Sequence, residues 1–317
     1  MGGALQEGRV GVVVPAHEDP TGLQRCLEAL DLAAPDAPFV AVVDDASAQP
    51  EQAALLDELE AGGRVRVLRN PRNLGFAGTS NRGLRAAAAA GCQEVLLLNQ
   101  DAVLTREALE RLSSLLAAHP RAAAVGPRTL SLSEGPAGRR TLLFDGAFRR
   151  SLPLQQRIPG IGRPDPGGRP GPCRSDYLWG HALLLRVDAL RQVGLFDAGF
   201  PFYYEDLDLC RRLSSAGWEL WVCRDEVALH DQEDGSRARS SELWRWQKKL
   251  LGADLFHRKH YGPARAPLLN LLNALHESRH LVRHGHLRAL LHLGRSYLHQ
   301  ARQAALVSRP EQLEEAS

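Results

Sequence analysis

The chain has 317 residues, with 39 Lys and Arg against 37 Asp and Glu and a formal net charge of +2. This length is sufficient to bury a large core in one big domain or two smaller ones. The near-neutral charge provides no strong positive field, so we expect no nucleic-acid partner.

Cysteine use and apolar runs narrow the class further. The five cysteines are widely spaced without a CxxC pair, which argues against a zinc ribbon or redox dithiol and indicates reduced thiols. The N-terminal residues lack signal-peptide features, and no run approaches the roughly 18 apolar residues of a transmembrane helix. We therefore expect a cytoplasmic protein, with peripheral contact at the inner face of the membrane as an open alternative.

The first 118 residues alternate between short apolar runs and segments with helical spacing. The predicted strands are Val10–Val14, Phe39–Val43, Arg64–Leu68 and Glu94–Leu98. The predicted helices are Thr21–Leu32, Glu51–Ala61, Gly78–Ala90 and Thr105–Ala118, with Thr105 as the N-cap of the last. This alternation predicts an α/β fold with a Rossmann-like, mostly parallel sheet and helices on both faces.

Three of the predicted strands end in polar residues, namely Pro15-Ala16-His17, Asp44-Asp45 and Asn99-Gln100-Asp101. Ligands of such sheets bind beyond the carboxyl ends of the strands, so we expect these ends to converge on one crevice. Asp101 suits a hard divalent cation that also binds diphosphate oxygens. His230, at the end of a later predicted strand, is either a second contact there or a capping residue.

The pattern changes after residue 120. Further strands are predicted at Ala122–Leu130, Leu183–Leu185, Glu219–Val222 and Val227–Leu229, helices at Asp188–Gln192 and Glu205–Ala216, and a hairpin or extended segment at Thr141–Leu152. Pro153–Pro172 is dense in Pro and Gly, which predicts a mobile loop that is either a lid or a tolerated surface insertion. From Ser241 the chain is helical and basic.

Three carboxylates, Glu205, Asp206 and Asp208, occupy four positions in an apolar, aromatic stretch. Neighbouring carboxylates repel one another and burial raises their pKa values, so this segment suggests acid–base chemistry. Asp208 is predicted to pair structurally with Arg211 or Arg212, one helical turn later.

Several known motifs are absent, including GxxxxGKS/T, GxSxG, HExxH and a GxGxxG after the first strand. A glycine-spaced loop from Asn73 to Gly83 enters a helix instead. Its backbone N–H groups either face a diphosphate or sugar, or form a tight turn that allows close helix packing.

The chain contains six sequence blocks in the following order: VVVPAHEDP, VVDDAS, NLGFAGTSNRGL, VLLLNQD, the run from Gly180 to Trp218, and His230 followed by Gly235-Ser236. Together these blocks resemble a family 2 glycosyltransferase of GT-A fold. Within that family the chain resembles the rhamnosyltransferase-like branch. The resemblance implies a GT-A domain over residues 1–240, with a nucleotide-sugar half at about 1–125 and an acceptor half at about 126–240. Residues 241–317 then form a C-terminal helical extension.

The resemblance implies a metal-dependent, inverting hexosyltransferase that uses Mg²⁺ or Mn²⁺. The donor is expected to be dTDP-rhamnose or a UDP-hexose, and the acceptor a saccharide or lipid-linked hydroxyl in bacterial polysaccharide or glycoconjugate synthesis. Membrane contact through the C-terminal helices and a homodimer remain open, with a solvated helical cap on the core as the simpler alternative.

The resemblance also implies site residues. Donor contacts are Pro15, Ala16, His17, Asp44, Asp45, Asn73, Gly75, Phe76, Asn81, Asn99 and Gln100. The metal ligands are Asp101 and His230, and the general base is Asp206, with Glu205 as the second choice. The sugar and acceptor pocket is Gly180, His181, Phe196, Asp197, Tyr203 and Tyr204. His17 and Gln100 depart from the usual residues of the family.

Two alternative functions have less support in the sequence. A sugar-nucleotide pyrophosphorylase normally has a glycine-rich loop with Arg and Lys after its first strand, where this chain has Pro15-Ala16-His17. A non-catalytic nucleotide-sugar binding domain would not need the acidic and histidine residues Asp101, Glu205, Asp206 and His230.

Overall fold

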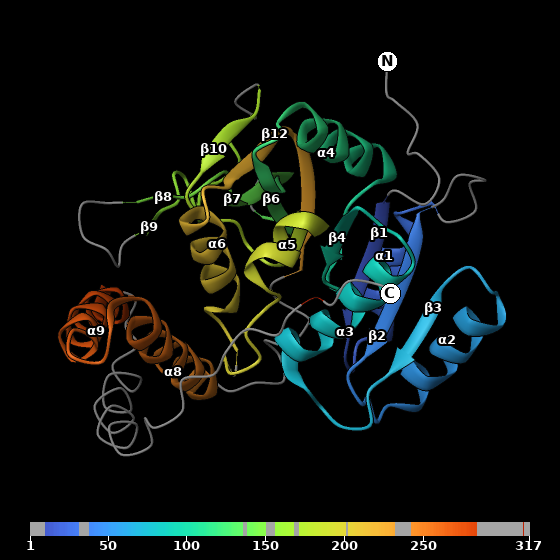
Figure 1. Cartoon of the computed structure of the whole chain (residues 1–317), viewed down its shortest axis with the longest axis horizontal. Helices are drawn as coiled ribbons and strands as arrows, with labels where there is room; N and C mark the ends of the chain where they lie inside the picture. Colours follow the sequence, from blue (N-terminus) through green and yellow to red (C-terminus); the bar gives the residue numbers. More distant parts are fainter. Residues whose placement is uncertain are drawn as a thin grey trace.

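A mixed sheet forms the centre of the molecule, in the strand order β10-β12-β6-β11-β4-β1-β2-β3, with β5 paired to β12 and β7 to β6. The structure is a computed structural model that describes residues 10–31, 38–135, 138–149, 156–167, 171–200, 202–231, 242–283 and Leu313. Gly235-Ser236, parts of the Pro- and Gly-rich segment and most of the chain after residue 283 therefore lie outside the described residues. Figure 1 shows the sheet between its helices.

The N-terminal half of the sheet is parallel, as predicted. Its strands are β1 (Val10–Ala16), β2 (Phe39–Asp44), β3 (Arg66–Arg69) and β4 (Glu94–Leu98). The helices between and after them are α1 (Pro20–Glu28), α2 (Pro50–Ala61), α3 (Gly75–Ala89) and α4 (Arg106–Ala118). The predicted N-cap of α4 is confirmed, since the Thr105 hydroxyl accepts from the Ala108 N–H at 3.2 Å.

The second half of the sheet is mixed because β11 (Ala182–Arg186) runs antiparallel between β4 and β6 (Ala122–Glu134). The two strands predicted at 219–222 and 227–229 are one long strand, β12 (Glu219–His230), with an irregularity between Cys223 and Val227. The short strand β5 (Ala102–Val103), which the pattern did not predict, pairs with the end of β12. The remaining elements here are β7 (Arg140–Phe144), β8 (Phe148–Arg149), β9 (Gln156–Arg157), β10 (Cys173–Ser175), α5 (Val187–Val193) and α6 (Glu205–Ser215).

Two apolar clusters cover the two faces of the sheet. Val12 and Val14 face the cluster that includes α1, α2 and α4, while Val13 faces the cluster that includes α3, α5 and α6. This alternation follows from the period of two in a strand. Because these strands are buried on both faces, they are almost continuously apolar.

The described part of the Pro- and Gly-rich segment lies along β7. The Leu142 N–H donates to the Arg163 carbonyl and the Gly162 N–H to the Leu142 carbonyl, both at 2.9 Å. The Asp165 N–H donates to the Arg140 carbonyl at 2.8 Å. These bonds attach residues 162–165 to the edge of the sheet.

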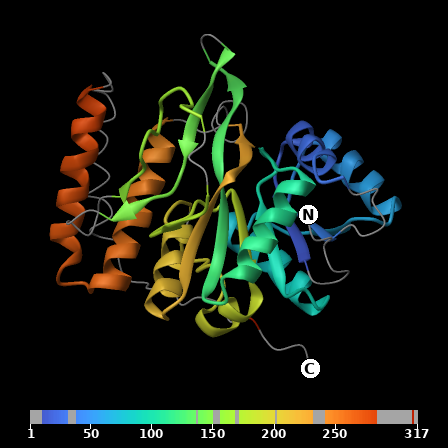
Figure 2. The same ribbon diagram turned by 90° about the horizontal axis from the view of Figure 1, so that it is seen from above.

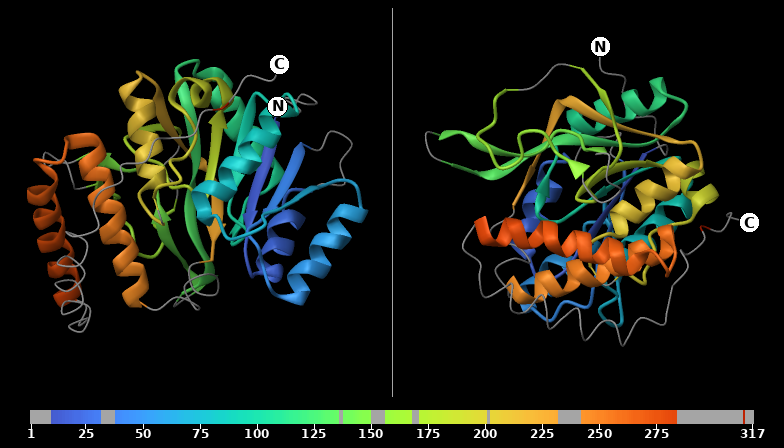
Figure 3. Two further views of the ribbon diagram at one scale, coloured as in Figure 1. Left: turned by 60° about the horizontal axis from the view of Figure 1, so that its bottom comes forward. Right: turned by 90° about the vertical axis from the view of Figure 1, so that its left-hand side faces the viewer.

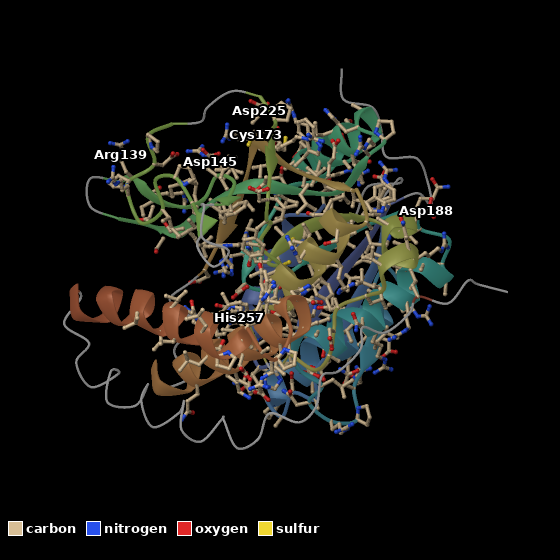
Figure 4. All side chains as sticks on the ribbon, turned by 60° about the vertical axis from the view of Figure 1, so that its left-hand side comes forward. Arg139, Asp145, Cys173, Asp188, Asp225 and His257 are labelled. Atoms are coloured by element: carbon tan, nitrogen blue, oxygen red, sulfur yellow. The ribbon has the colours of Figure 1, made fainter. Side chains whose placement is uncertain are left out.

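The C-terminal helices α8 (Glu242–Tyr261) and α9 (Ala266–Arg283) lie side by side, at the end of the molecule opposite α1 and α2 (Figures 2 and 3). Their contact contains a buried hydrogen bond of 2.5 Å between His257 Nδ1 and Asn270 Oδ1. Figure 4 shows where His257 lies on α8. None of the described helices combines the length and apolarity needed to cross a membrane.

Candidate functional site

The carboxyl ends of β1, β2 and β4 meet, as predicted. Ala16 pairs with Asp44, and the Asp45 N–H donates to the Ala16 carbonyl at 2.8 Å. The Gln100 side chain joins the ends of β4 and β1, because its Nε2 donates to the His17 carbonyl at 2.8 Å and its Oε1 accepts from the His17 N–H at 2.9 Å. Gln100 therefore acts as a bridge between two strand ends.

Asp44 and Asp45 have different surroundings. Asp45 accepts from the N–H groups of Leu74 at 2.7 Å and Gly75 at 3.0 Å, and from Asn70 Nδ2 at 2.9 Å. These bonds explain why α3 begins at Gly75 and not at the predicted Gly78. Asp44 accepts from the Ser47 N–H through Oδ2 at 3.2 Å, while its Oδ1 is buried without a hydrogen-bond partner among the described residues. Asp44 is thus the carboxylate with an oxygen available to a ligand.

The glycine-spaced loop is attached to the segment before α6. Asn73 accepts from the Gly75 N–H at 3.1 Å within the loop. The buried Asn81 amide donates to the Phe196 carbonyl at 2.8 Å and accepts from the Phe196 N–H at 3.0 Å. Phe76 packs edge-on against the Phe196 ring at 5.7 Å. Asn81, which we expected to contact the donor, is engaged in joining these two segments.

Asp101 and His230 are brought together by the pairing of β5 with β12. Ala102 lies opposite His230 in the ladder, and His230 Nε2 lies 3.3 Å from Asp101 Oδ1. The ring of His181 stacks on that of His230 at 4.6 Å, and its Nε2 is 2.9 Å from Thr129 Oγ1. Burial, followed by the charge of His230, holds the pKa of His181 well below its usual range, so His181 is neutral near pH 7.

The polar atoms around Asp101 fit a divalent cation. Asn99 Oδ1, Asp101 Oδ1 and both ring nitrogens of His230 are buried and make no hydrogen bond within the part of the chain that the structure describes. The described residues contain no cluster of three or more His, Cys, Asp and Glu side chains suited to a metal. A Mg²⁺ ion bound to diphosphate needs only one or two protein carboxylates, so this sparse set is compatible with such an ion.

The first turn of α6 presents Glu205 and Asp206. Asp206 Oδ2 accepts from the Tyr177 hydroxyl at 2.6 Å and the Gly180 N–H at 3.2 Å, and its Oδ1 accepts from the Leu207 N–H at 2.8 Å. Burial raises the pKa of Asp206. Burial and the charge of Asp206 raise the pKa of Glu205 to about 8. The Oε2 of Glu205 is buried without a hydrogen-bond partner among the described residues.

Tyr177 is a site residue that sequence reasoning missed. It lies 29 positions from Asp206 in a segment without clear periodicity, so no local signal marked it. Gly180, which we did predict, allows a close approach: a Cβ there would lie 3.3 Å from Asp206 Cβ and 3.4 Å from Phe76 Cζ. The glycine-spaced loop, β11 and the start of α6 therefore meet at Gly180.

The turn before α6 has an uncommon backbone conformation. Tyr203 and Tyr204 have φ values of +67° and +72°, in the left-handed region that residues other than glycine seldom occupy. Each such residue costs roughly 1–3 kcal/mol and persists only where the surrounding structure enforces it. This turn places Glu205 and Asp206 at the helix start, where N–H groups favour negative charge.

Asp197 and Asp208 lie in buried ion pairs beside the site. Asp208 forms the predicted pair with Arg212 at 2.8 Å and also contacts Lys259 at 2.9 Å. Burial acts to raise the pKa of Asp208, but His260, Arg212 and Lys259 together outweigh it and lower that pKa to about 2. Asp197, which we expected in the sugar pocket, contacts Lys259 at 2.5 Å.

Comparisons with known proteins give matches over most of the chain. The family model described as "Glycosyl transferase family 2" matches residues 11–193. The chain is 30% identical over 277 residues to an N-acetylglucosaminyl-diphospho-decaprenol L-rhamnosyltransferase of Mycobacterium tuberculosis, covering 81% of this chain and 87% of that relative. Neither a pyrophosphorylase nor a non-catalytic domain is favoured by these matches.

Two solved structures share the GT-A fold. One is GalNAc-T7 with UDP, GalNAc and Mn²⁺, with a TM-score of 0.59 and 16% identity, covering 82% of this chain and 51% of that chain. The other is the mannosyltransferase PcManGT from Pyrobaculum calidifontis with GDP-Man and Mn²⁺, with a TM-score of 0.54 and 18% identity, covering 94% of this chain and 76% of that chain.

Proposed function

Because the chain belongs to glycosyl transferase family 2 and is a nucleotide-sugar-dependent glycosyltransferase of GT-A fold, we propose that it is an inverting rhamnosyltransferase. In this proposal dTDP-rhamnose is the first candidate donor and a UDP-hexose the second. Support comes from the relative that covers 81% of this chain and is named as a rhamnosyltransferase. The observation that carries the proposal is that Asp206 and Phe76 both lie beside Gly180, where the glycine-spaced loop meets the start of α6.

The proposed base is Asp206. Inverting transfer requires the acceptor hydroxyl to lose its proton as its oxygen attacks the anomeric carbon and the diphosphate leaves. Tyr177 and two backbone N–H groups donate to Asp206 and favour its ionised form. The Oε2 of Glu205 has no hydrogen-bond partner among the described residues, and the pKa of Glu205 is about 8. Near pH 7 Glu205 thus holds a proton, and the hydrogen bonds to Asp206 make it the carboxylate of the pair that ionises more readily.

The donor is proposed to bind across the strand ends. Asp44 Oδ1 would accept a hydrogen bond from the nucleoside, beside Pro15, Ala16 and His17. Asp101 and His230 would hold Mg²⁺ or Mn²⁺, with Asn99 close by. When bound, the metal would neutralise charge that develops on the leaving diphosphate. In this assignment residues 1–125 form the nucleotide-sugar half and residues 126–240 the acceptor half.

The acceptor is proposed to be lipid-linked, as in the relative named for a diphospho-decaprenol substrate. Four leucines of α9 are exposed, namely Leu268, Leu271, Leu272 and Leu275. Their spacing of i, i+3, i+4 and i+7 places them on one face of the helix. We call this set the α9 leucine stripe. It would contact the membrane in which the acceptor resides, so the protein would be peripheral.

A donor screen tests the function. Purified protein with Mg²⁺ or Mn²⁺ is given dTDP-rhamnose, UDP-glucose, UDP-N-acetylglucosamine or GDP-mannose and an N-acetylglucosaminyl-diphospho-prenol acceptor, and nucleoside diphosphate release is measured. Turnover of dTDP-rhamnose is the expected result, and release from none of the donors would contradict the proposal.

The base is tested by Asp206→Asn. We expect the transfer rate to fall by a factor of about 10² to 10⁴, with donor binding kept within a few-fold. The matched control is Asp188→Asn, at a carboxylate that lies on the surface (Figure 4). Normal turnover by Asp206→Asn would show that another group takes the proton.

A further inference from the structure

One face of α8 contacts the segment that carries Glu205 and Asp206. This face consists of Lys249, Gly252, Phe256, Lys259 and His260. Their spacing of three or four residues, with one adjacent pair, places all five on the same side of a helix. Both α6 and α8 lie beyond the residues 11–193 that the family model matches, and Figure 1 shows α8 next to the lower end of α6.

The N-terminal part of this face contacts the turn at Tyr203 and Tyr204 directly. A Cβ at Gly252 would lie 2.7 Å from the Tyr203 carbonyl oxygen and 3.0 Å from Tyr204 Cδ2, so only glycine allows this approach of helix and turn. Lys249 Nζ lies 5.4 Å from the centre of the Tyr203 ring. The Phe256 ring lies 5.8 Å from that of Tyr204.

The C-terminal part of the face contacts the chain on both sides of the turn. Lys259 Nζ lies 2.5 Å from Asp197 Oδ2, before the turn, and 2.9 Å from Asp208 Oδ1, after it. His260 Nε2 lies 2.8 Å from the same oxygen of Asp208. Asp197 and Asp208 are buried, so their charges depend on these partners for compensation.

We propose that this face of α8 positions the turn at Tyr203–Tyr204, and through it Glu205 and Asp206, with Lys259 as the central positioning residue. A turn with two left-handed tyrosines persists only where surrounding contacts enforce it. Gly252, Phe256 and Lys259 supply such contacts from α8. The inference rests on the proposed role of Asp206 as the base.

The first test compares Lys259→Met with Lys259→Arg, in the nucleotide-release assay with dTDP-rhamnose. Misplacement of a base lowers the rate of the chemical step, so we expect kcat of Lys259→Met to fall about 10- to 100-fold, with KM for the donor within about two-fold. Lys259→Arg keeps the charge and should restore most of kcat. The matched control is Arg258→Met, which removes the neighbouring cation that pairs with Asp254 at 2.7 Å.

Equal losses of kcat in Lys259→Met and Arg258→Met would overturn the proposal, because a general loss of α8 stability would affect both. So would an unchanged kcat in Lys259→Met. Wild-type turnover in the same assay tests the proposed function separately, since that function fails if wild-type protein releases no nucleoside diphosphate.

Gly252→Ala gives a second test that does not remove a charge. Alanine is a better helix former than glycine, so propensity alone predicts a more stable α8 and unchanged turnover. The positioning role predicts a loss of activity instead. We expect kcat to fall to about one tenth of the wild-type value or below, with KM for the donor retained. Gly62→Ala is the matched control, because its added Cβ would have its nearest neighbour at 3.5 Å. Wild-type kcat in Gly252→Ala, with folding confirmed by circular dichroism, would contradict the proposal.

Discussion

Adjacent carboxylates in this protein differ in role because their hydrogen-bond partners differ. Asp45 accepts hydrogen bonds from the loop that starts α3, whereas Asp44 has one buried oxygen without a hydrogen-bond partner in the described part of the chain. Asp208 contacts Arg212 and Lys259, whereas Glu205 is buried next to the charge of Asp206. Residue type alone therefore does not assign a role; the surrounding donors and charges do.

The pH dependence of stability should reveal Glu205. Its pKa is raised from an ordinary value of 4.5 to about 8, so between these values the folded protein holds more protons than the unfolded chain. The contribution of Glu205 to the free energy of unfolding therefore decreases as pH rises through this window, by at most about 1.4 kcal/mol per pH unit. We expect urea titrations to show Glu205→Gln gaining stability over wild type between about pH 5 and pH 8.

Glu51→Gln, at an exposed carboxylate of α2, controls for the general effect of removing a charge. If the stability of Glu205→Gln and wild type changed in parallel with pH, Glu205 would not be held protonated in the folded protein.

Removal of Asp101 should affect nucleotide binding through the metal. We expect Asp101→Ala to weaken calorimetric binding of UDP or dTDP when Mg²⁺ or Mn²⁺ is present, and to change it little in EDTA. The reason is that a cation held by Asp101 and His230 would bridge to diphosphate oxygens. Asp188→Ala serves as the surface control. An equal loss with and without metal would argue for a direct contact between Asp101 and the nucleotide.

At the scale of elements, a close contact between helix and sheet sets the position of α3 on β1 and β2. A Cβ at Gly83 would lie 2.2 Å from Val13 Cγ1 and 3.0 Å from Val43 Cγ2. Gly83 therefore lets α3 pack directly on β1 and β2, which supports the packing interpretation for this glycine of the loop. The start of α3 is held by Asp45, at the carboxyl end of β2.

Gly83→Ala should destabilise the protein although alanine favours helix. Overpacking against Val13 and Val43 is expected to lower the free energy of unfolding by about 1–3 kcal/mol. Chemical denaturation compared with Gly62→Ala, whose Cβ meets only ordinary contacts, measures the effect. Equal stabilities of the two variants would mean that α3 can move away from the sheet at little cost.

At the scale of the whole molecule, the helical pair α8 and α9 lies at the end opposite α1 and α2 (Figures 2 and 3). Residues 242–283 carry eight Lys and Arg against three Asp and Glu. The α9 leucine stripe therefore belongs to a basic segment, a combination that favours anionic lipid surfaces. The same helical pair contacts the turn before α6, so membrane contact and catalysis would involve one structural unit.

Vesicle binding tests the membrane contact. We expect the full chain to co-sediment with vesicles of phosphatidylcholine and phosphatidylglycerol, and a triple Leu268→Gln, Leu271→Gln, Leu275→Gln variant to lose most of this binding because apolar area no longer inserts. Ile161→Gln removes an exposed apolar side chain outside the stripe and is the control. Wild-type protein that stays in the supernatant as a dimer by light scattering would contradict membrane contact.

Local pattern determined much of this protein: the β–α alternation, the meeting of three polar strand ends, the N-cap at Thr105 and the pair of Asp208 with Arg212. The cap, the ion pair and each β–α unit follow from residues within a few positions of one another, and the parallel order of such units brings the strand ends to one edge of the sheet. Tertiary structure alone decided that Asp45 anchors α3, that Asn81 holds Phe196, that Tyr177 orients Asp206, and that Lys259 joins Asp197 to Asp208. Such contacts join residues about 30 to more than 100 positions apart, and no periodicity records them because they arise only when the whole sheet and its helices are packed.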